Sequence, residues 1–372
     1  MSAIASLDAL FELDAFAAGA EADRRFLAAV RDVCAHHIAH CPTYRRLCEQ
    51  EGFAPERLAR IDDLVELPWI MVNVFKRHRL LSVPERELVA TFTSSGTTGQ
   101  QSQIAWDQGS MARQDAMRAA IVRGLGLESS EPANYLVFAY APEVAGGKGA
   151  AHAHSRYTAF APAAERFFAI HADAEGAPVF RVEECLEQLA RFAASGLALR
   201  VIGFPAFAWR MLREMAAREL RIAFPPGSLM ILAGGWKAAQ DEAVPRARFA
   251  AVAAEHLGIP PEAQHDVYGF VEHGVPYMTC EVGRFHVPVY ARALTRRPGG
   301  LEPLGRGEPG LLQVVSPYNL AQPALSVLAT DYAIVDQGCP CGRGGDTLDI
   351  IGRAGVAKHQ GCAITAAELL KS

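Results

Sequence analysis

The sequence has no long apolar run, no block of basic residues and no dense set of cysteines. Its most apolar stretches, residues 201–209 and 229–236, are far shorter than the roughly 18 residues that a membrane-spanning helix needs. Eight cysteines in 372 residues are too few for a disulfide scaffold. Lys plus Arg number 36 against 41 for Asp plus Glu, which gives a net charge of -5. These absences exclude a membrane span and a disulfide framework, and they argue against nucleic-acid binding.

The composition that remains is that of a globular protein. Apolar residues make up 50% of the chain and charged residues 21%, which is typical of a packed core. The length indicates two domains, or one large domain with an appendage. The N-terminus carries Asp8, Glu12 and Asp14 and no basic region, so it does not look like a secretory signal. We therefore expect a soluble, cytoplasmic protein whose cysteines are reduced thiols or metal ligands.

Hydrophobic periodicity predicts an α/β architecture for most of the chain. Predicted helices cover residues 20–40, 108–124, 183–195, 206–221 and 241–257. Pro42 is expected to interrupt the first of them. Predicted strands cover residues 88–92, 103–106, 135–140, 199–204 and 229–232. Strands that alternate with helices of this length indicate a largely parallel sheet. After Gly258 the pattern changes to short strands around Val267, 285–290, 311–315 and 333–335, separated by Gly and Pro, which indicates an antiparallel or barrel-like part.

The sharpest local motif is a hydroxyl-rich and glycine-rich loop. It reads Thr93, Ser94, Ser95, Gly96, Thr97, Thr98 and Gly99. Two glycines three residues apart let successive N–H groups turn towards one anion, and five hydroxyl groups add donors for phosphate oxygens. It is not a P-loop, because Gln100 stands where that motif has a lysine. The alternative interpretation is a hydroxyl-rich hairpin turn.

Charged residues further along the chain could complete a nucleotide site. Glu272 follows a predicted strand and could hold Mg²⁺, and Asp331 could accept two hydrogen bonds from a ribose diol. Arg353 and Lys358 could neutralise phosphate charge. Alternatively, the two carboxylates cap strand ends and Arg353 is a surface charge. The chain has only five lysines, so Lys237, directly after Gly234, Gly235 and Trp236, is also a candidate for a functional role.

Cysteine and histidine spacing indicates one metal site. Cys280, His286, Cys339 and Cys341 offer three sulfurs and one imidazole in two short segments, a ligand set suited to tetrahedral zinc. Alternatively, Pro340 and Gly342 shape the second turn without a metal. Cys34, Cys41 and Cys48 recur every seven residues, which is more typical of small buried side chains. His36, His37 and His40 are expected to face solvent.

In this order, the motifs resemble those of the adenylate-forming superfamily, which includes acyl-CoA synthetases and luciferases. The resemblance narrows to the LuxE-type acyl-protein synthetases, which are related to phenylacetate-CoA ligases. It is carried by TSSGTTGQQSQI (93–104), AGGWK (233–237), YGFVEH (268–273), HVP (286–288), CPCGR (339–343) and IIGR (350–353), and by CPTYRRLCEQEGF (41–53) and LPWIMVNVFK (67–76). These motifs span nearly the whole chain.

The resemblance implies the fold and its division. It implies the large domain of an adenylate-forming ligase, with parallel α/β subdomains and a small barrel-like β subdomain, and a truncated C-terminal segment. Residues 1–257 would form the α/β region that binds the acyl group and ATP. Residues 258–351 would form a β-rich subdomain that completes the nucleotide site, and residues 352–372 a hinge and short tail.

The resemblance also implies roles for individual residues. The loop from Ser94 to Gly99 would hold the ATP phosphates, with Gly234, Gly235, Trp236, Tyr268 and Gly269 in the nucleotide site. Glu272 would bind Mg²⁺, Asp331 the ribose, and Arg353 would begin the hinge. Full-length relatives carry a catalytic lysine in a further C-terminal domain, and this chain stops at Ser372. In LuxE-type enzymes a cysteine near the C-terminus accepts the acyl group, and Cys362 occupies that place.

We therefore interpret the chain as an ATP-dependent ligase. A carboxylic acid, expected to be a fatty acid, would form an acyl-adenylate and pass its acyl group to Cys362, with Lys237 and Lys358 as further catalytic candidates. A partner similar to an acyl-CoA reductase would then take the acyl group. The alternatives are an aryl- or acyl-CoA ligase that uses free CoA, a non-catalytic nucleotide-binding scaffold for a reductase, and a Cys362 that merely packs a final strand.

Overall fold

The computed structural model describes residues 4–93, 102–141, 156–172, 178–236, 242–354 and 363–364. The chain forms two compact units. The first comprises Met1–Leu125, Gly269–Tyr277 and Arg284–Ser372, and the second Gly126–Tyr268 and Met278–Gly283. This division differs from the ranges predicted from the sequence, because the N-terminal 125 residues belong with the C-terminal strands. Among the described residues, no helix combines the length and apolarity that a bilayer crossing requires.

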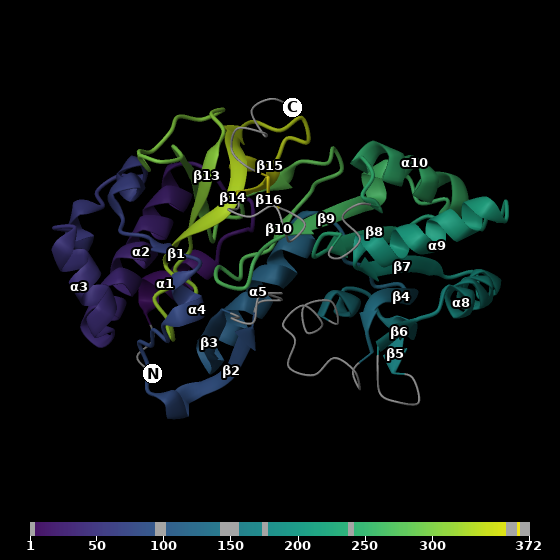
Figure 1. The fold of residues 1–372 in the computed structure, drawn as a ribbon, viewed down its shortest axis with the longest axis horizontal. Helices are drawn as coiled ribbons and strands as arrows, with labels where there is room; N and C mark the ends of the chain where they lie inside the picture. The colour runs from purple at the N-terminus through teal and green to yellow at the C-terminus, as the bar shows by residue number, and fades with distance from the viewer. Residues whose placement is uncertain are drawn as a thin grey trace. The chain divides into compact units, whose positions relative to one another are not determined.

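The second unit is built on a mainly parallel sheet (Figure 1). Its strand order is β10-β9-β8-β7-β4-β5-β6. The bounds are β4 Ala133–Tyr140, β5 Ala163–Ala172, β6 Pro178–Phe180, β7 Ala198–Gly203, β8 Leu229–Ala233, β9 Gln264–Tyr268 and β10 Tyr277–Met278. The pairs from β9 through β5 are parallel, and β6 is antiparallel to β5. The parallel sheet predicted from the sequence is confirmed.

Three helices, α8 (Val182–Ala194), α9 (Pro205–Ala217) and α10 (Arg246–Leu257), pack on this sheet. Alternate strand residues point to them, including Leu136 and Phe138 of β4, and these form one core with apolar residues at helical spacing. Helix α10 begins later than the predicted residue 241, because Pro245 precedes it with a fixed φ and no N–H.

The first unit contains a mostly antiparallel sheet in the order β11-β15-β14-β13-β12. The bounds are β11 Phe285–His286, β12 Arg292–Arg296, β13 Gly310–Val315, β14 Ser326–Gln337 and β15 Asp346–Ala354. Two short strands, β1 (Ile70–Met71) and β16 (Ala363–Ile364), add in parallel to β14 and β15 respectively. The predicted strand around Val267 was wrongly grouped with this part: it is β9, and it pairs with β8 in the parallel sheet.

Helices and a hairpin from the N-terminal part complete the first unit. The helices are α1 Ala5–Phe11, α2 Ala20–His40, α3 Pro42–Gln50, α4 Val74–Arg77 and α5 Gln108–Gly124, and the hairpin strands are β2 Leu88–Thr93 and β3 Gln103–Asp107. Short 3₁₀ turns lie at Pro55–Arg57, Ile61–Glu66 and Glu85–Glu87, and the second unit has two more, at Tyr157–Ala159 and Pro261–Ala263. The interruption predicted at Pro42 is confirmed: α2 ends at His40, and Pro42 occupies the first turn of α3.

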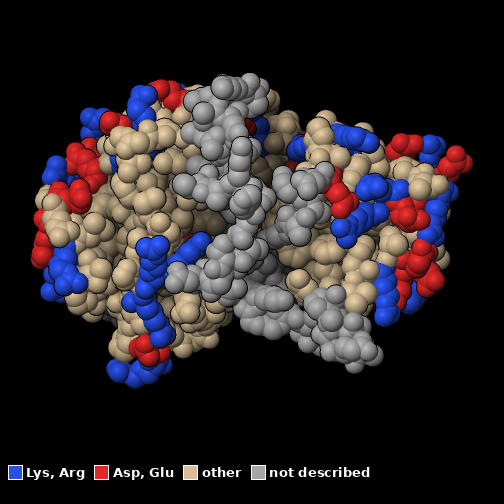
Figure 2. All heavy atoms as spheres, viewed as in Figure 1, with Lys and Arg blue, Asp and Glu red and all other residues tan. Residues whose placement is uncertain are grey.

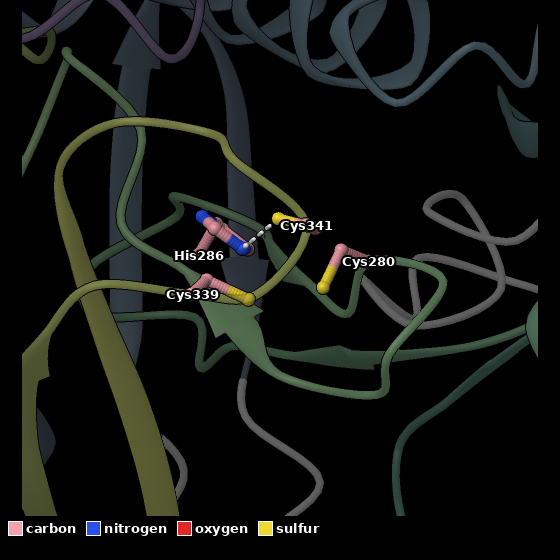
Figure 3. Close-up of side chains that lie close together, drawn as sticks. All are labelled: Cys280, His286, Cys339 and Cys341. Atoms are coloured by element: carbon pink, nitrogen blue, oxygen red, sulfur yellow. Dashed lines mark hydrogen bonds between the residues drawn. The ribbon is translucent and has the colours of Figure 1, made fainter.

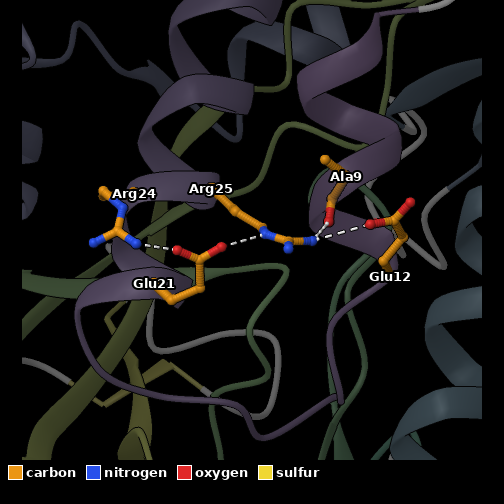
Figure 4. A network of polar contacts seen from close by, with 5 residues as sticks. All are labelled: Ala9, Glu12, Glu21, Arg24 and Arg25. Carbon is orange, nitrogen blue, oxygen red and sulfur yellow. Dashed lines mark hydrogen bonds and ion pairs between the residues drawn. The ribbon is translucent and has the colours of Figure 1, made fainter.

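An arginine fork joins α1 to the start of α2 (Figure 4). The Arg25 guanidinium donates to Glu21 at 2.7 Å, to the Ala9 carbonyl oxygen at 2.8 Å and to Glu12 at 3.1 Å, and Arg24 also pairs with Glu21. On the face drawn in Figure 2, basic and acidic side chains are mixed over the part of the chain that is described. Exposed ion pairs of this kind contribute little to the free energy of unfolding.

Candidate active site

The hydroxyl-rich loop connects the two strands of a hairpin. Strands β2 and β3 pair in antiparallel fashion, and their last pair is Thr93 opposite Gln103. The other members of the predicted phosphate loop, Ser94, Ser95, Gly96, Thr97, Thr98 and Gly99, lie outside the described residues. The pairing of Thr93 with Gln103 therefore brings the two ends of the loop together. The role of the loop in phosphate binding stays a prediction.

Two buried amides hold strand β3 in place. The Gln322 side chain accepts from the Ala105 backbone N–H at 2.7 Å and donates to the Gln103 carbonyl at 3.3 Å. The Asn319 side chain donates to the Ala105 carbonyl, also at 3.3 Å. Because both amides are buried, these bonds are shielded from water. The segment that leaves the loop is thus anchored by residues more than 200 positions later in the sequence.

The backbone of Asn319 is hydrogen-bonded to a buried histidine, His37, whose position was predicted wrongly from the sequence. His37 of α2 was predicted to face solvent, and this is wrong: its side chain is fully buried. Its Nε2 lies 3.1 Å from the Asn319 carbonyl and its Nδ1 lies 2.8 Å from Ser82 Oγ. Burial, reinforced by the neighbouring His36, lowers the pKa of His37 to about 3. The predicted burial of Cys34, Cys41 and Cys48 is confirmed.

Glu272 lies in a tight turn that follows β9. The side chain of Glu272 is only 6% exposed. Backbone N–H groups of His273 and Gly274 both donate to the Phe270 carbonyl, at 3.2 and 2.9 Å, which closes the turn around Glu272. His273 is fully buried, and its Nε2 lies 2.7 Å from the Tyr277 hydroxyl. A nearly buried carboxylate on a closed turn is a suitable oxygen ligand for a divalent cation.

Asp331 and Arg353 are direct partners in the antiparallel pair β14–β15. Asp331 is 7% exposed. On the other side of β15, Arg353 pairs with Ala363 of the short strand β16. The backbone positions of Asp331, Arg353 and Ala363 therefore lie side by side on three neighbouring strands, β14, β15 and β16. Cys362 and Lys358 fall outside the described residues.

The glycine pair after β8 leads to an aromatic cluster. Gly234 and Gly235 both have positive φ, at +87° and +64°, which a residue with a side chain rarely adopts. Trp236 lies edge-on to Trp209 and Phe249, each with ring centroids 6.4 Å apart, so it borders the core of its unit. Tyr268 ends β9 and Gly269 follows it. Their predicted place in the nucleotide site remains a prediction, and Lys237 lies outside the described residues.

The four predicted metal ligands do converge (Figure 3). Cys280 follows β10, His286 lies on β11, and Cys339 and Cys341 lie in the turn between β14 and β15. Their ligand atoms all lie within 4.8 Å of one another, and Cys341 Sγ is 3.3 Å from His286 Nε2. In a tetrahedral zinc site with the usual bond lengths, neighbouring ligand atoms are about 3.5–3.8 Å apart. The arrangement is therefore close to the geometry that zinc requires.

Sequence reasoning missed the residues that support the site. The amides of Gln114, Asn319 and Gln322 and the ring of His37 lie in no motif, and each partner is far away in the sequence. Two signals were available: Gly274 directly follows the YGFVEH motif and has a positive φ, and His37 lies at helical spacing from Phe26 and Val33 on the apolar face of α2.

Comparisons with known proteins agree with the motifs. A family model described as "Acyl-protein synthetase, LuxE" matches residues 2–371. The chain is 27% identical over 350 residues to a long-chain-fatty-acid–luciferin-component ligase of Aliivibrio fischeri, over 92% of this chain and 88% of that protein. It is 26% identical over 346 residues to the ligase of that name from Vibrio harveyi, over 90% and 85%.

A solved structure extends this comparison to the fold. The structure of 2-hydroxyisobutyryl-CoA ligase in its postadenylation state superposes with a TM-score of 0.67 and 18% sequence identity, over 91% of this chain and 69% of that one. At this identity the likeness shows the fold alone, which is that of the adenylate-forming ligases. The chain therefore belongs to the LuxE family of acyl-protein synthetases, adenylate-forming enzymes that join the carboxyl group of an acid to a thiol.

Proposed function

We propose that this enzyme activates a fatty acid with ATP and Mg²⁺, and that Cys362 then accepts the acyl group and delivers it to a reductase-like protein. The observation that carries the proposal is the match to the acyl-protein synthetase family over residues 2–371. The fatty acid is supported by the relatives from Aliivibrio fischeri and Vibrio harveyi, whose names specify long-chain fatty acids.

The first step forms a mixed anhydride. A carboxylate oxygen of the acid attacks the α-phosphorus of ATP, the bond between the α- and β-phosphates breaks, and pyrophosphate leaves with the electron pair. Glu272 offers a buried carboxylate that fits a hard cation such as Mg²⁺. When bound, Mg²⁺ supplies positive charge against the developing phosphate charge. Asp331 would orient the ribose, and the loop between Thr93 and Gln103 would hold the phosphates by backbone N–H groups.

The second step transfers the acyl group to sulfur. A thiolate attacks the acyl carbonyl carbon, the carbon–oxygen bond to AMP breaks, and AMP leaves as a phosphate anion. Cys362 is supported by the pairing of the next residue, Ala363, with Arg353, which itself lies opposite Asp331. The residues directly after Cys362 thus pair with β15, and β15 in turn pairs with the part of β14 that carries Asp331, the proposed ribose ligand. Thiolates form readily near neutral pH, which suits this role.

The test separates activation from transfer. The protein is incubated with ATP, Mg²⁺ and a panel of fatty and aromatic acids, and acid-dependent exchange of labelled pyrophosphate into ATP reports the first step. Intact-protein mass then reports the second: we expect a gain equal to the acid minus water. Cys362→Ser should retain exchange and lose the hydroxylamine-sensitive mass gain, whereas Thr365→Ala in the same tail should retain both.

Other outcomes would contradict parts of the proposal. A mass gain that persists in Cys362→Ser would identify a different nucleophile. A soluble thioester formed only when CoA is added would identify a CoA ligase. No acid-dependent exchange with any acid would contradict activation itself. The reductase-like partner is tested by adding an acyl-CoA reductase to the labelled protein and following loss of the label.

We also propose a structural zinc ion held by Cys280, His286, Cys339 and Cys341. The proposal is supported by a donor set of three sulfurs and one imidazole whose ligand atoms lie within 4.8 Å of one another. Cys280 and His286 are buried and the other two are partly buried, and four protein ligands would complete the tetrahedral shell of a structural zinc ion. Elemental analysis of protein purified without chelators should find about one zinc per chain, and absence of zinc would refute this assignment.

A further inference from the structure

The turn that carries Glu272 is fixed by contacts from outside the turn. Gln114 of α5 donates from its side-chain Nε2 to the Gly274 carbonyl oxygen at 3.2 Å, across 160 positions of sequence. Gly274 has φ at +75°, and a Cβ at this position would lie 2.0 Å from the Tyr318 hydroxyl. Because Tyr318 is fully buried, its ring cannot move away easily. The end of the turn is therefore clamped between α5 and Tyr318.

Gln114 is itself oriented by a buried arginine. Its side-chain oxygen accepts from Arg118, one helical turn later, and Arg118 also donates to Asp115 at 2.9 Å. Gln114 is 6% exposed and Arg118 is buried as well. Since the guanidinium can only donate, it fixes which end of the Gln114 amide is the oxygen, and the amide nitrogen is left to face Gly274. The hydrogen bond to the turn is thus set by two residues on one face of α5.

Helix α5 is separated from the hydroxyl-rich loop only by strand β3. Strand β3 ends at Asp107, and Asp107 caps α5 by accepting from the Ser110 N–H at 2.9 Å. The loop, β3 and α5 are consecutive in the chain, and Gln114 lies on the second turn of the helix. Strand β3 and helix α5 therefore run from Gln103, the first strand residue after the loop, to Gln114, which bonds to the turn proposed to present the Mg²⁺ ligand.

We propose that Gln114 is a positioning residue for the activation step, which holds the Glu272 turn against helix α5 through its hydrogen bond to Gly274. The inference rests on the proposed function, because it gives Gln114 a role in the Mg²⁺-dependent reaction. Gln114 does not touch the reacting atoms. Its loss should loosen the carboxylate that holds the cation while it leaves the acid-binding step unchanged.

The experiment compares two chemically matched substitutions. Gln114→Met keeps the volume and removes the donor. The control is Gln313→Met, because Gln313 is also buried and also accepts from a buried arginine, Arg296, but donates to Ser326 rather than to the Glu272 turn. Acid-dependent pyrophosphate exchange is measured against Mg²⁺ concentration. We expect half-saturating Mg²⁺ to rise about three- to tenfold in Gln114→Met only, as the loss of one buried hydrogen bond implies.

The readouts distinguish positioning from mere folding. The melting temperature should fall in both variants, and the KM for the acid should stay at the wild-type value in both. Equal Mg²⁺ dependence in Gln114→Met and wild type, or an equal rise in Gln313→Met, would overturn the inference. If Gln114→Met does not fold, Gln114→Asn replaces it, because it keeps an amide and shortens the side chain by one methylene, about 1.5 Å. No exchange in the wild-type protein would instead contradict the proposed function.

Discussion

His37 should make this protein sensitive to acid in a way that one substitution removes. Its Nε2 faces the Asn319 carbonyl oxygen at 3.1 Å. Because a carbonyl oxygen only accepts, the proton resides on Nε2, and Nδ1 accepts from the Ser82 hydroxyl at 2.8 Å. The fully buried ring is therefore neutral in the folded protein, and burial, with a further contribution from His36, lowers its pKa to about 3.

The magnitude follows from linkage between protonation and folding. In the unfolded chain the pKa of a histidine is about 6.5. The folded pKa is lower, so the contribution of His37 to stability is complete above pH 6.5 and is lost as the pH falls towards about 3. Between pH 7.5 and pH 5 the unfolded state gains a proton that the folded state does not bind. This difference lowers the free energy of unfolding by about 2 kcal/mol.

The assay is urea unfolding of the wild type and His37→Gln at pH 7.5 and pH 5. The variant is less stable at pH 7.5, because it loses the packing and the hydrogen bonds of the ring. The gap between the two proteins should shrink by about 2 kcal/mol at pH 5, since only the wild type carries this titration. His78→Gln, at an exposed histidine, should leave the pH dependence unchanged. A gap that stays constant across this pH range would refute the reasoning.

The remaining predictions concern the metal, the nucleotide and the core. Cys339→Ser should lower the zinc content of the purified protein and its melting temperature by several degrees, which elemental analysis and calorimetry would check, and an unchanged zinc content would contradict the proposed ligand set. Asp331→Ala should weaken ATP binding by about 1.5–3 kcal/mol for each charge-assisted hydrogen bond lost, as measured by calorimetry, and an unchanged Kd would remove Asp331 from the site. Leu212→Ala, in the fully buried face of α9, should cost about 2–5 kcal/mol of unfolding free energy, against less than about 1 kcal/mol for Arg213→Ala on the exposed face.

Local patterns in the sequence determined much of the architecture. Helix α5 has the predicted limits, because Asp107 caps its first turn and Gly126, which has a positive φ, follows shortly after its last. Strands β4, β7 and β8 are mainly apolar, so they could be predicted without knowledge of their neighbours, whereas the parallel strand β5, which carries Glu165, Arg166 and His171, was not predicted. The ligands of the proposed zinc site were also predicted, because sulfur and imidazole groups in short segments carry a chemical signal of their own.

Tertiary structure alone decided the pairings between distant segments. Strand β14 covers Ser326–Gln337, whereas only residues 333–335 were predicted as a strand. The additional residues are extended because they pair with β13 and β15, which are distant in the sequence. The sequence places His37 on the same face of α2 as Phe26 and Val33, but only the fold supplies its partner, the Asn319 carbonyl 282 positions later. Gln114 reaches Gly274 across 160 positions. A hydrogen bond between such residues leaves no periodicity and no motif, so only the folded chain brings the proposed catalytic carboxylate and its support together.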